Sequence, residues 1–139
     1  MQIKPYIRKP FYYETDQMQV VHHSNYIRWF EESRLYFLDQ IGFPYEKIEE
    51  MGILIPVLSV TSNFHEFAKY GEEVRIEIAI THFNGVRMNI DYNIYNNKTN
   101  KLINTGSSSH CFLDKEYKVV RLKKYLPDLY EALLKHLKK

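Results

Sequence analysis

The longest regular pattern in the chain is an apolar stripe at helical spacing that begins shortly after residue 23. Its members recur every three or four positions on one face: Tyr26, Phe30, Ser33, Phe37 and Ile41. This spacing is typical of an amphipathic helix that packs one face on a core. Ser24 or Asn25 can serve as the N-cap, and Gly42 suits the positive φ that ends many helices. The pattern predicts a helix of about five turns.

Beyond residue 73 the period of the pattern changes from 3.6 to 2. Apolar and polar residues alternate over residues 74–81 and again over residues 86–94, as in strands with one buried face. Asn84 and Gly85 lie between the two runs, and both tolerate the positive φ that a type I′ turn requires. We therefore predict an antiparallel hairpin.

Weaker patterns fill the rest of the chain. Three further extended runs are expected at residues 6–14, 53–70 and 101–113. Pro44 opens a short helix that runs through Met51 and ends at Gly52. Pro127 opens a terminal helix with leucines on one face.

The order of these elements predicts the architecture. A strand, a long helix and a short helix precede a meander of at least four antiparallel strands and a last helix, which is an α+β layer arrangement. We expect one domain over residues 1–139, with the long helix covering one sheet face. Because a single curved sheet of this size leaves edges uncovered, we also expect a dimer.

Composition narrows the function classes. The 139 residues are 45% hydrophobic, with 19 basic and 17 acidic side chains and a net charge of +2. That near balance argues against nucleic-acid binding unless the charges segregate. They do so only in the C-terminal lysines, which a solvated helix face explains.

The single cysteine, Cys111, lies in a strand-like run and is expected to be a buried thiol. The N-terminal residues carry no apolar core of signal-peptide length, and no run reaches the roughly 18 apolar residues of a membrane span. We expect a cytoplasmic protein without a membrane span.

The window from Tyr12 to Tyr26 concentrates the candidate chemistry. It joins an extended aromatic segment to the long helix through a polar loop that contains Asp16. An acid before a helix is commonly a turn or cap residue. Here the predicted N-cap lies eight or nine positions further on, so Asp16 has no capping task on that helix.

Unpaired N–H groups at the start of the helix are the natural counterpart of this acid. If the loop folds back, the carboxylate faces the amides of His23 and Ser24, which can stabilise an oxyanion. His22 and His23 point in different directions, and no second ligand cluster accompanies them, so we expect no metal. Ser24 lacks a nucleophile elbow, and N-capping explains it more simply.

Two groups of residues keep alternative interpretations. Tyr12, Tyr13 and Tyr26 either shape an acyl pocket or serve aromatic packing, and Trp29 is assigned to packing. The small residues in the run 105–110 either admit a ligand backbone or mark a bulge.

The residues from Tyr12 to Tyr26, followed by Trp29 to Arg34, closely resemble the opening motif of the 4-hydroxybenzoyl-CoA thioesterase-like acyl-CoA thioesterases. The nearest branch is the one with the Tol-Pal-associated thioesterases. The resemblance covers nearly the whole chain and is specific over residues 12–34.

The resemblance implies a hotdog fold, an antiparallel sheet wrapped around the long helix. It also implies homodimers or homotetramers with active sites at the dimer interface, and no cofactor. Asp16 matches the catalytic acid of the family. His23 matches the residue whose amide polarises the thioester carbonyl. Two departures stand out: Gln19 replaces a common glycine, and Phe67 replaces a proline that often precedes alanine.

The predicted activity is hydrolysis of acyl-CoA to free acid and CoA, with Asp16 acting as nucleophile or as base. Tyr13, Ser24 and Asn25 are candidate substrate contacts. Arg87 is a candidate phosphate contact, although a solvated edge charge explains it as well. The alternatives are a non-catalytic acyl-thioester-binding protein and a thioesterase for acyl-carrier-protein substrates, which needs a basic docking patch.

Overall fold

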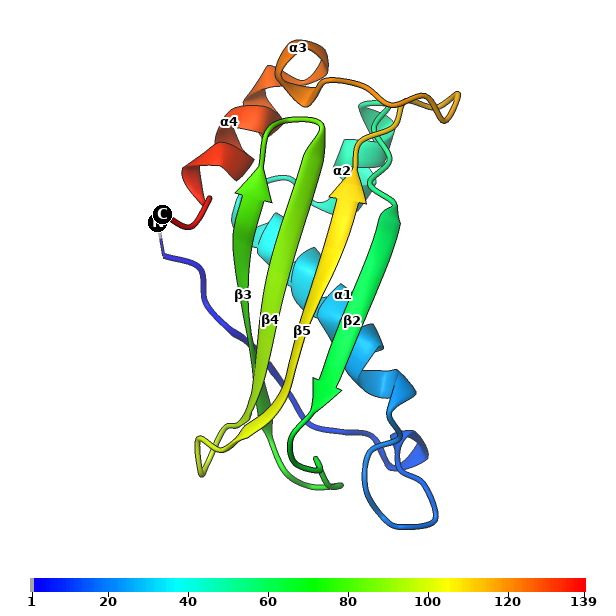
Figure 1. Cartoon of the computed structure of the whole chain (residues 1–139), viewed down its shortest axis with the longest axis vertical. Helices are drawn as coiled ribbons and strands as arrows, with labels where there is room; N and C mark the ends of the chain where they lie inside the picture. The colour runs from blue at the N-terminus through cyan, green and yellow to red at the C-terminus, as the bar shows by residue number, and fades with distance from the viewer. Residues whose placement is uncertain (1) are drawn as a thin grey trace. The chain divides into compact units, whose positions relative to one another are not determined.

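A computed structural model describes residues 2–139. The elements follow the chain in the order β1 (Tyr6–Arg8), η1 (Tyr12–Glu14), α1 (Ser24–Gln40), α2 (Tyr45–Glu50), β2 (Val57–Phe64), β3 (Val74–Phe83), β4 (Arg87–Asn96), β5 (Leu102–Cys111), α3 (Leu122–Tyr125) and α4 (Pro127–Lys135). The five strands form one sheet in the order β1-β3-β4-β5-β2, and neighbouring strands run in opposite directions (Figure 1). The predicted α+β class is confirmed.

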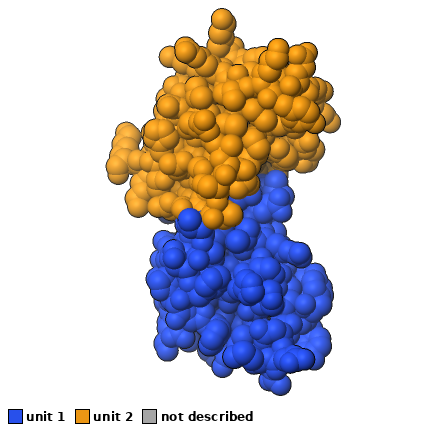
Figure 2. Space-filling model, turned by 45° about the vertical axis from the view of Figure 1, so that its right-hand side comes forward, with its two compact units in different colours: residues 1–37, 61–78, 92–106 blue, residues 38–60, 79–91, 107–139 orange. Residues whose placement is uncertain are grey.

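The chain divides into two compact units, coloured separately in Figure 2. Unit 1 comprises residues 1–37, 61–78 and 92–106, and unit 2 comprises residues 38–60, 79–91 and 107–139. Each of α1, β2, β3, β4 and β5 contributes residues to both units. The prediction of one domain over residues 1–139 stays a prediction.

The predicted long helix is confirmed as α1, with its apolar stripe turned inward. Tyr26, Phe30, Ser33 and Phe37 are all buried, whereas Ile41 lies beyond the end of the helix and is only half-buried. A helix of 17 residues with one buried face derives most of its stability from that packing.

Gly106 explains how α1 approaches the sheet within unit 1. A Cβ atom at this position would lie 2.5 Å from the Phe30 ring and 2.5 Å from the Thr61 carbonyl oxygen. The Phe30 ring also stacks on Tyr92 of β4, with centroids 4.3 Å apart. The absence of a side chain at residue 106 therefore serves the packing of an aromatic ring, which neither interpretation of the run 105–110 anticipated.

The hairpin prediction is confirmed, but its predicted turn type is wrong. Gly85 has a φ of 87°, whereas Asn84 is not among the residues with positive φ. The side-chain oxygen of Asn84 instead accepts hydrogen bonds from the N–H groups of Val86 and Arg87, at 2.9 and 2.8 Å. An asparagine that bonds its own backbone in this way forms an Asx-type turn.

The extended segment predicted at residues 6–14 is shorter than expected. Strand β1 ends at Arg8, and a 3₁₀ turn occupies Tyr12–Glu14. The turn forms because the Glu14 carboxylate accepts the Phe11 N–H at 2.7 Å, which holds the chain back on itself. The second predicted run, 53–70, contains only the strand β2.

Two smaller differences concern the helices. Pro44 precedes α2 as its N-cap, and α3 was not predicted. In α4, Leu129 and Leu133 are buried while Leu134 is exposed. Cys111 is a buried free thiol, as predicted. None of the helices in residues 2–139 combines the length and the apolar character that a membrane span requires.

Candidate active site

The Asp16 carboxylate lies on a tight turn with one of its two oxygens unpaired. The Asp16 N–H donates to the Val20 carbonyl at 2.9 Å, and the Gln19 N–H donates to the Asp16 carbonyl at 3.0 Å. Oδ1 accepts the Met18 N–H at 2.8 Å. Within residues 2–139, Oδ2 of this half-buried side chain has no hydrogen-bond partner. One carboxylate oxygen is therefore available for chemistry while the other fixes the turn.

Gln19 occupies the strained position of this turn. Its φ of 66° lies in the left-handed region, where glycine carries no Cβ penalty. The cost for another residue is roughly 1–2 kcal/mol. Gln19 stands where the resemblance implies a glycine, and its backbone still adopts the conformation that glycine favours.

His23, the residue directly before α1, has an unpaired N–H. The Ser24 N–H donates to His22 Nδ1 at 3.2 Å, and the Ser24 hydroxyl lies 2.9 Å from the same nitrogen. No acceptor in residues 2–139 pairs with the His23 N–H. Of the two amides that the sequence offered as oxyanion donors, only the His23 N–H is unpaired.

The N-cap prediction is corrected by the same contacts. The helix begins at Ser24, and neither Ser24 nor Asn25 caps it through its side chain. The imidazole of His22 takes this place by accepting a backbone N–H.

The turn that carries Asp16 is followed closely in the chain by α1. Thr15 and Val21 form an antiparallel bridge that closes the turn. The Tyr26 hydroxyl in the first turn of α1 accepts the Ala68 N–H at 3.2 Å. Burial raises the pKa of this hydroxyl, and the negative charge of Asp16 raises it further. The charge of Asp16 therefore acts at the start of the helix.

A buried ion-pair network holds this turn, and the sequence did not reveal it. Glu14 is only 4% exposed and accepts hydrogen bonds from Arg8 Nη1 at 2.5 Å, from the Phe11 N–H at 2.7 Å and from Trp29 Nε1 at 3.1 Å. Arg8 also pairs with Glu32 at 2.6 Å. Burial raises the pKa of Glu14, but the hydrogen bonds from Arg8, Phe11 and Trp29 outweigh it and lower the pKa.

No local pattern could have identified this network. The pairs lie 6, 15 and 24 positions apart in the sequence. Trp29, assigned to packing from the sequence, also carries one of these hydrogen bonds. The network ties β1, η1 and α1 together and fixes the base of the turn that carries Asp16.

The other predicted site residues differ in their environments. Tyr13 and Ser24 are exposed, whereas Asn25 is buried and donates through Nδ2 to the Glu14 carbonyl at 2.9 Å. These three residues share unit 1 with Asp16 and His23. Arg87 opens β4 as an exposed residue of unit 2. Their contacts with substrate stay predictions.

Aromatic rings surround the start of α1. The exposed Phe64 ring lies 6.4 Å from the His23 ring and 5.6 Å from the Tyr26 ring. Tyr26 is buried, whereas Tyr12 and Tyr13 are exposed. Phe64 was missed in the sequence because its place beside the helix depends on the pairing of β2 in the sheet.

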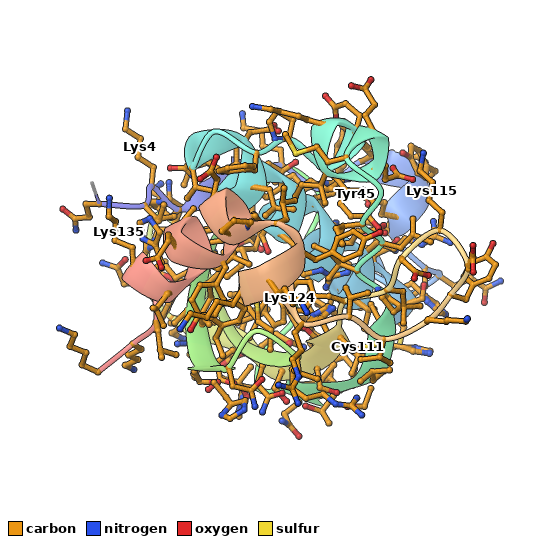
Figure 3. The ribbon with its side chains drawn as sticks, turned by 90° about the horizontal axis from the view of Figure 1, so that it is seen from above. Lys4, Tyr45, Cys111, Lys115, Lys124 and Lys135 are labelled. Carbon is orange, nitrogen blue, oxygen red and sulfur yellow. The ribbon has the colours of Figure 1, made fainter. Side chains whose placement is uncertain are left out.

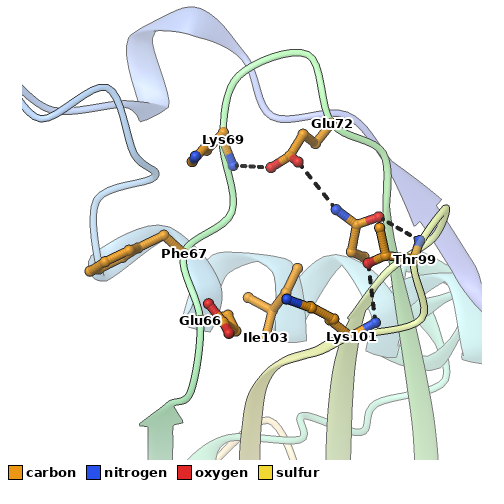
Figure 4. A pocket seen from close by; sticks show the side chains of 8 residues that line it. Glu66, Phe67, Lys69, Glu72, Thr99, Lys101 and Ile103 are labelled. Atoms are coloured by element: carbon orange, nitrogen blue, oxygen red, sulfur yellow. Dashed lines mark hydrogen bonds between the residues drawn. The ribbon is translucent and has the colours of Figure 1, made fainter.

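A hollow of about 290 Å³ lies elsewhere in unit 1 (Figure 4). Glu72 shapes it by accepting hydrogen bonds from the Lys69 N–H at 3.1 Å and from Asn96 Nδ2 at 3.3 Å. Two lysines and two glutamates line it, together with exposed Phe67, so its charges balance. Because of that balance, we assign no anion to this hollow.

The structure offers no metal site among residues 2–139: no three histidine, cysteine, aspartate or glutamate side chains gather in a way that could hold an ion.

Comparison with known proteins gives the family. The family model of the thioesterase-like superfamily matches residues 12–133. A putative acyl-CoA thioesterase, YneP, of Bacillus subtilis (strain 168) is 35% identical over 122 residues, covering 87% of this chain and 88% of that protein. A putative esterase of Aquifex aeolicus (strain VF5) is 30% identical over 119 residues, covering 86% and 91%.

Solved structures agree with these relatives. The DHNA-CoA thioesterase from Staphylococcus aureus matches with a TM-score of 0.89 and 33% identity, covering 95% of this chain and 89% of that one. The match extends over nearly the whole of both chains, so the predicted hotdog fold is confirmed. The chain belongs to the thioesterase-like superfamily.

Proposed function

We propose that this protein hydrolyses acyl-CoA thioesters to a free acid and CoA, with Asp16 and the His23 amide as its catalytic groups. As a member of this superfamily with relatives named as CoA thioesterases, the chain is a thioester hydrolase. One observation carries the assignment of residues: the unpaired Asp16 oxygen lies in the turn closed by the Thr15–Val21 bridge, and the unpaired His23 N–H follows that bridge by two residues.

The His23 N–H acts on the carbonyl oxygen of the thioester. As the carbonyl carbon becomes tetrahedral, negative charge develops on that oxygen, and an N–H at a helix start stabilises it. The interaction is stronger in the transition state than in the ground state, which is the condition for catalysis. When the C–S bond breaks, the electron pair on this oxygen re-forms the C=O double bond and the thiolate leaves.

Asp16 supplies the attack by one of two routes. As a base, it takes a proton from water, the water oxygen bonds to the carbonyl carbon, and CoA leaves as its thiolate. As a nucleophile, Oδ2 itself bonds to the carbonyl carbon and expels the thiolate, and water then hydrolyses the mixed anhydride. Both routes need the carboxylate ionised and one oxygen unpaired.

The remaining predicted contacts complete the proposal. The exposed Tyr13 ring and the Ser24 hydroxyl are accessible to the substrate near the helix start, and Asn25 acts through the Glu14 carbonyl that it holds. Arg87 contributes a positive charge for a CoA phosphate. The His23 side chain orients water or the leaving thiolate.

We expect the active form to be a homodimer or homotetramer. Strand β2 lies at one edge of the sheet and exposes Val57, Leu58 and Phe64. An exposed edge strand with apolar side chains is a template for pairing with a second strand. Pairing through β2 would join two sheets edge to edge, as the resemblance implies.

Two finer assignments rest on separate features, the sequence motif and the cysteine. The motif in residues 12–34 favours the 4-hydroxybenzoyl-CoA thioesterase-like group and its Tol-Pal-associated branch. A cytoplasmic location is favoured by the single, unpaired cysteine.

Thiol release from a panel of acyl-CoA thioesters tests the proposed activity. We expect wild-type protein to release free CoA, and Asp16→Asn prepared in the same way to lose most of the activity. Equal rates for the two proteins would contradict the roles given to Asp16. Binding of acyl-CoA without turnover in wild-type protein would instead favour the non-catalytic acyl-thioester-binding alternative.

A basic cluster in unit 2 favours acyl-carrier-protein thioesters as a second candidate substrate. Arg121 and Lys124 line a hollow of about 500 Å³ with Val120 and Tyr125. Lys115 and Lys135 are also exposed, but they lie apart from Lys124 in the view of Figure 3, so the cluster consists of Arg121 and Lys124. Positive patches attract acidic partners, so the panel should include a carrier-protein thioester at low and high salt.

A further inference from the structure

Asn104 on β5 is a buried polar residue for which the proposed mechanism has no use. Its side chain is fully buried, and its oxygen Oδ1 accepts the Ser62 hydroxyl at 3.1 Å. Its nitrogen Nδ2 has no hydrogen-bond partner among residues 2–139. A buried donor without an acceptor is costly, and native proteins keep few of them.

The neighbours of Asn104 place it on the side of the sheet that faces α1. Gly106, two residues along β5, shares that side, because alternate residues of a strand point the same way. The Phe30 ring of α1 approaches to 2.5 Å of the Cβ position of Gly106. Asn104 therefore lies between the sheet and the helix that carries the candidate oxyanion site at its start.

The same side of the sheet leads to the start of α1. On β2, Phe64 lies two residues from Ser62 and therefore points the same way. The Phe64 ring contacts the rings of His23 and Tyr26, with centroids 6.4 and 5.6 Å away. An acyl group attached to a carbonyl at the His23 N–H would enter this aromatic region.

We infer that Asn104 is a specificity residue that donates a hydrogen bond from Nδ2 to an oxygen of the acyl group. This rests on the proposed function. The substrates it selects are acyl-CoA thioesters whose acyl group carries a hydroxyl or carbonyl oxygen, in preference to plain hydrocarbon acyl groups. A hydrocarbon group leaves the buried donor unpaired, and sites of this kind discriminate strongly against the analogue that lacks the polar group.

Access to Asn104 requires a movement of a side chain, and Phe64 is suited to it. The ring is 55% exposed and pairs with the rings of His23 and Tyr26. Rotation of an exposed side chain takes picoseconds to nanoseconds, which is fast compared with turnover. Entry of the acyl group past Phe64 gives Nδ2 its acceptor.

The test compares pairs of acyl-CoA thioesters that differ by one hydroxyl group. Suitable pairs are benzoyl-CoA with its ring-hydroxylated counterparts, and a straight-chain acyl-CoA with the 3-hydroxyacyl-CoA of equal length. For wild-type protein we expect kcat/KM to favour the hydroxylated member of at least one pair by about tenfold or more. Asn104→Leu should lose this preference by slowing only the hydroxylated substrate.

Two controls separate selectivity from folding. Ser62→Ala removes the hydroxyl that holds Oδ1 but keeps Nδ2, so the preference should persist. The melting temperature of Asn104→Leu should stay close to that of wild-type protein, because removal of the unpaired buried donor offsets the loss of the hydrogen bond from Ser62. A wild-type protein with no preference, or a variant that slows both members of a pair equally, would overturn the inference.

A failure of the proposed function would look different, because no acyl-CoA of the panel would then be hydrolysed by wild-type protein. In that case calorimetric binding of the same pairs to wild-type and Asn104→Leu protein decides the inference. The inference is supported if wild-type protein binds the hydroxylated member of a pair more tightly and Asn104→Leu does not. Equal affinities of wild-type protein for both members overturn it.

Discussion

Glu14 and Asp16 are two positions apart in the sequence and have opposite environments. The carboxylate of Glu14 is buried and bonded by Arg8, by the Phe11 N–H and by Trp29. The carboxylate of Asp16 is half-buried and keeps one oxygen unpaired. A fully bonded carboxylate stabilises a fold, whereas one with an open oxygen can take a proton or attack a carbon. In this loop, Glu14 therefore serves the fold and Asp16 is available for chemistry.

Substituting Asp16 should have the largest effect on activity. Asp16→Asn keeps an oxygen for the Met18 N–H but loses the base or nucleophile, so we expect kcat to fall by about 10²–10⁴-fold. Thiol release measures this fall, and thermal unfolding should show an unchanged midpoint. A large drop in stability would mean that Asp16, like Glu14, serves the fold.

Two variants of His23 separate its backbone from its side chain. His23→Pro removes the N–H, and proline is tolerated at a helix start, so we expect a loss of about 10²–10³-fold in kcat. His23→Ala keeps the N–H and should lose less than about tenfold, since only a secondary role of the imidazole is removed. The reverse order of the two effects would place the chemistry on the imidazole.

Substituting Glu14 should affect stability more than chemistry. Glu14→Gln leaves the half-buried Arg8 with Glu32 as its remaining ion-pair partner, and we expect the free energy of unfolding to fall by about 3 kcal/mol. Urea unfolding measures this loss. If the variant is as stable as wild-type protein but inactive, the contrast between the two carboxylates is wrong.

The pH dependence of stability should follow Glu14. Its pKa in the folded protein is lowered from 4.5, despite burial, by hydrogen bonds from Arg8, Phe11 and Trp29. The contribution of Glu14 to the free energy of unfolding is therefore complete above pH 4.5. It is lost as the pH falls through the lower pKa that Glu14 has in the folded protein. Between pH 5 and pH 3, wild-type protein should lose stability more steeply than Glu14→Gln. Parallel curves for the two proteins would contradict this assignment.

The smallest expected effect concerns the turn itself. Gln19→Gly removes the penalty of a positive φ and should stabilise the protein by up to about 1 kcal/mol with activity retained. Gln17→Gly, in the same turn but without a positive φ, should destabilise it slightly because glycine adds unfolded-state entropy. Thermal unfolding of the pair checks this, and equal shifts would show that the φ of Gln19 carries no strain.

The regular elements were the most predictable part of the fold. Periods of 3.6 and 2 are local properties of the chain, so α1, β3 and β4 could be identified from spacing alone. Segments whose conformation depends on remote partners were less predictable. The predicted strand over residues 6–14 became a short strand and a 3₁₀ turn, because Glu14 bonds Arg8 and Trp29 from other elements.

For the candidate site, the sequence by itself identified Asp16, the helix start at His23 and, through the family motif, their joint chemistry. These are short-range features, because only seven positions separate the two residues. Only the tertiary structure decided which groups are unpaired: the His23 N–H rather than that of Ser24, one oxygen of Asp16, and Nδ2 of Asn104. The partners of the Ser24 N–H and of Asp16 Oδ1 lie only two positions away, whereas Ser62, the partner of Asn104 Oδ1, lies 42 positions away. Which of these bonds form depends on the folded backbone conformation, and residue spacing alone does not give it.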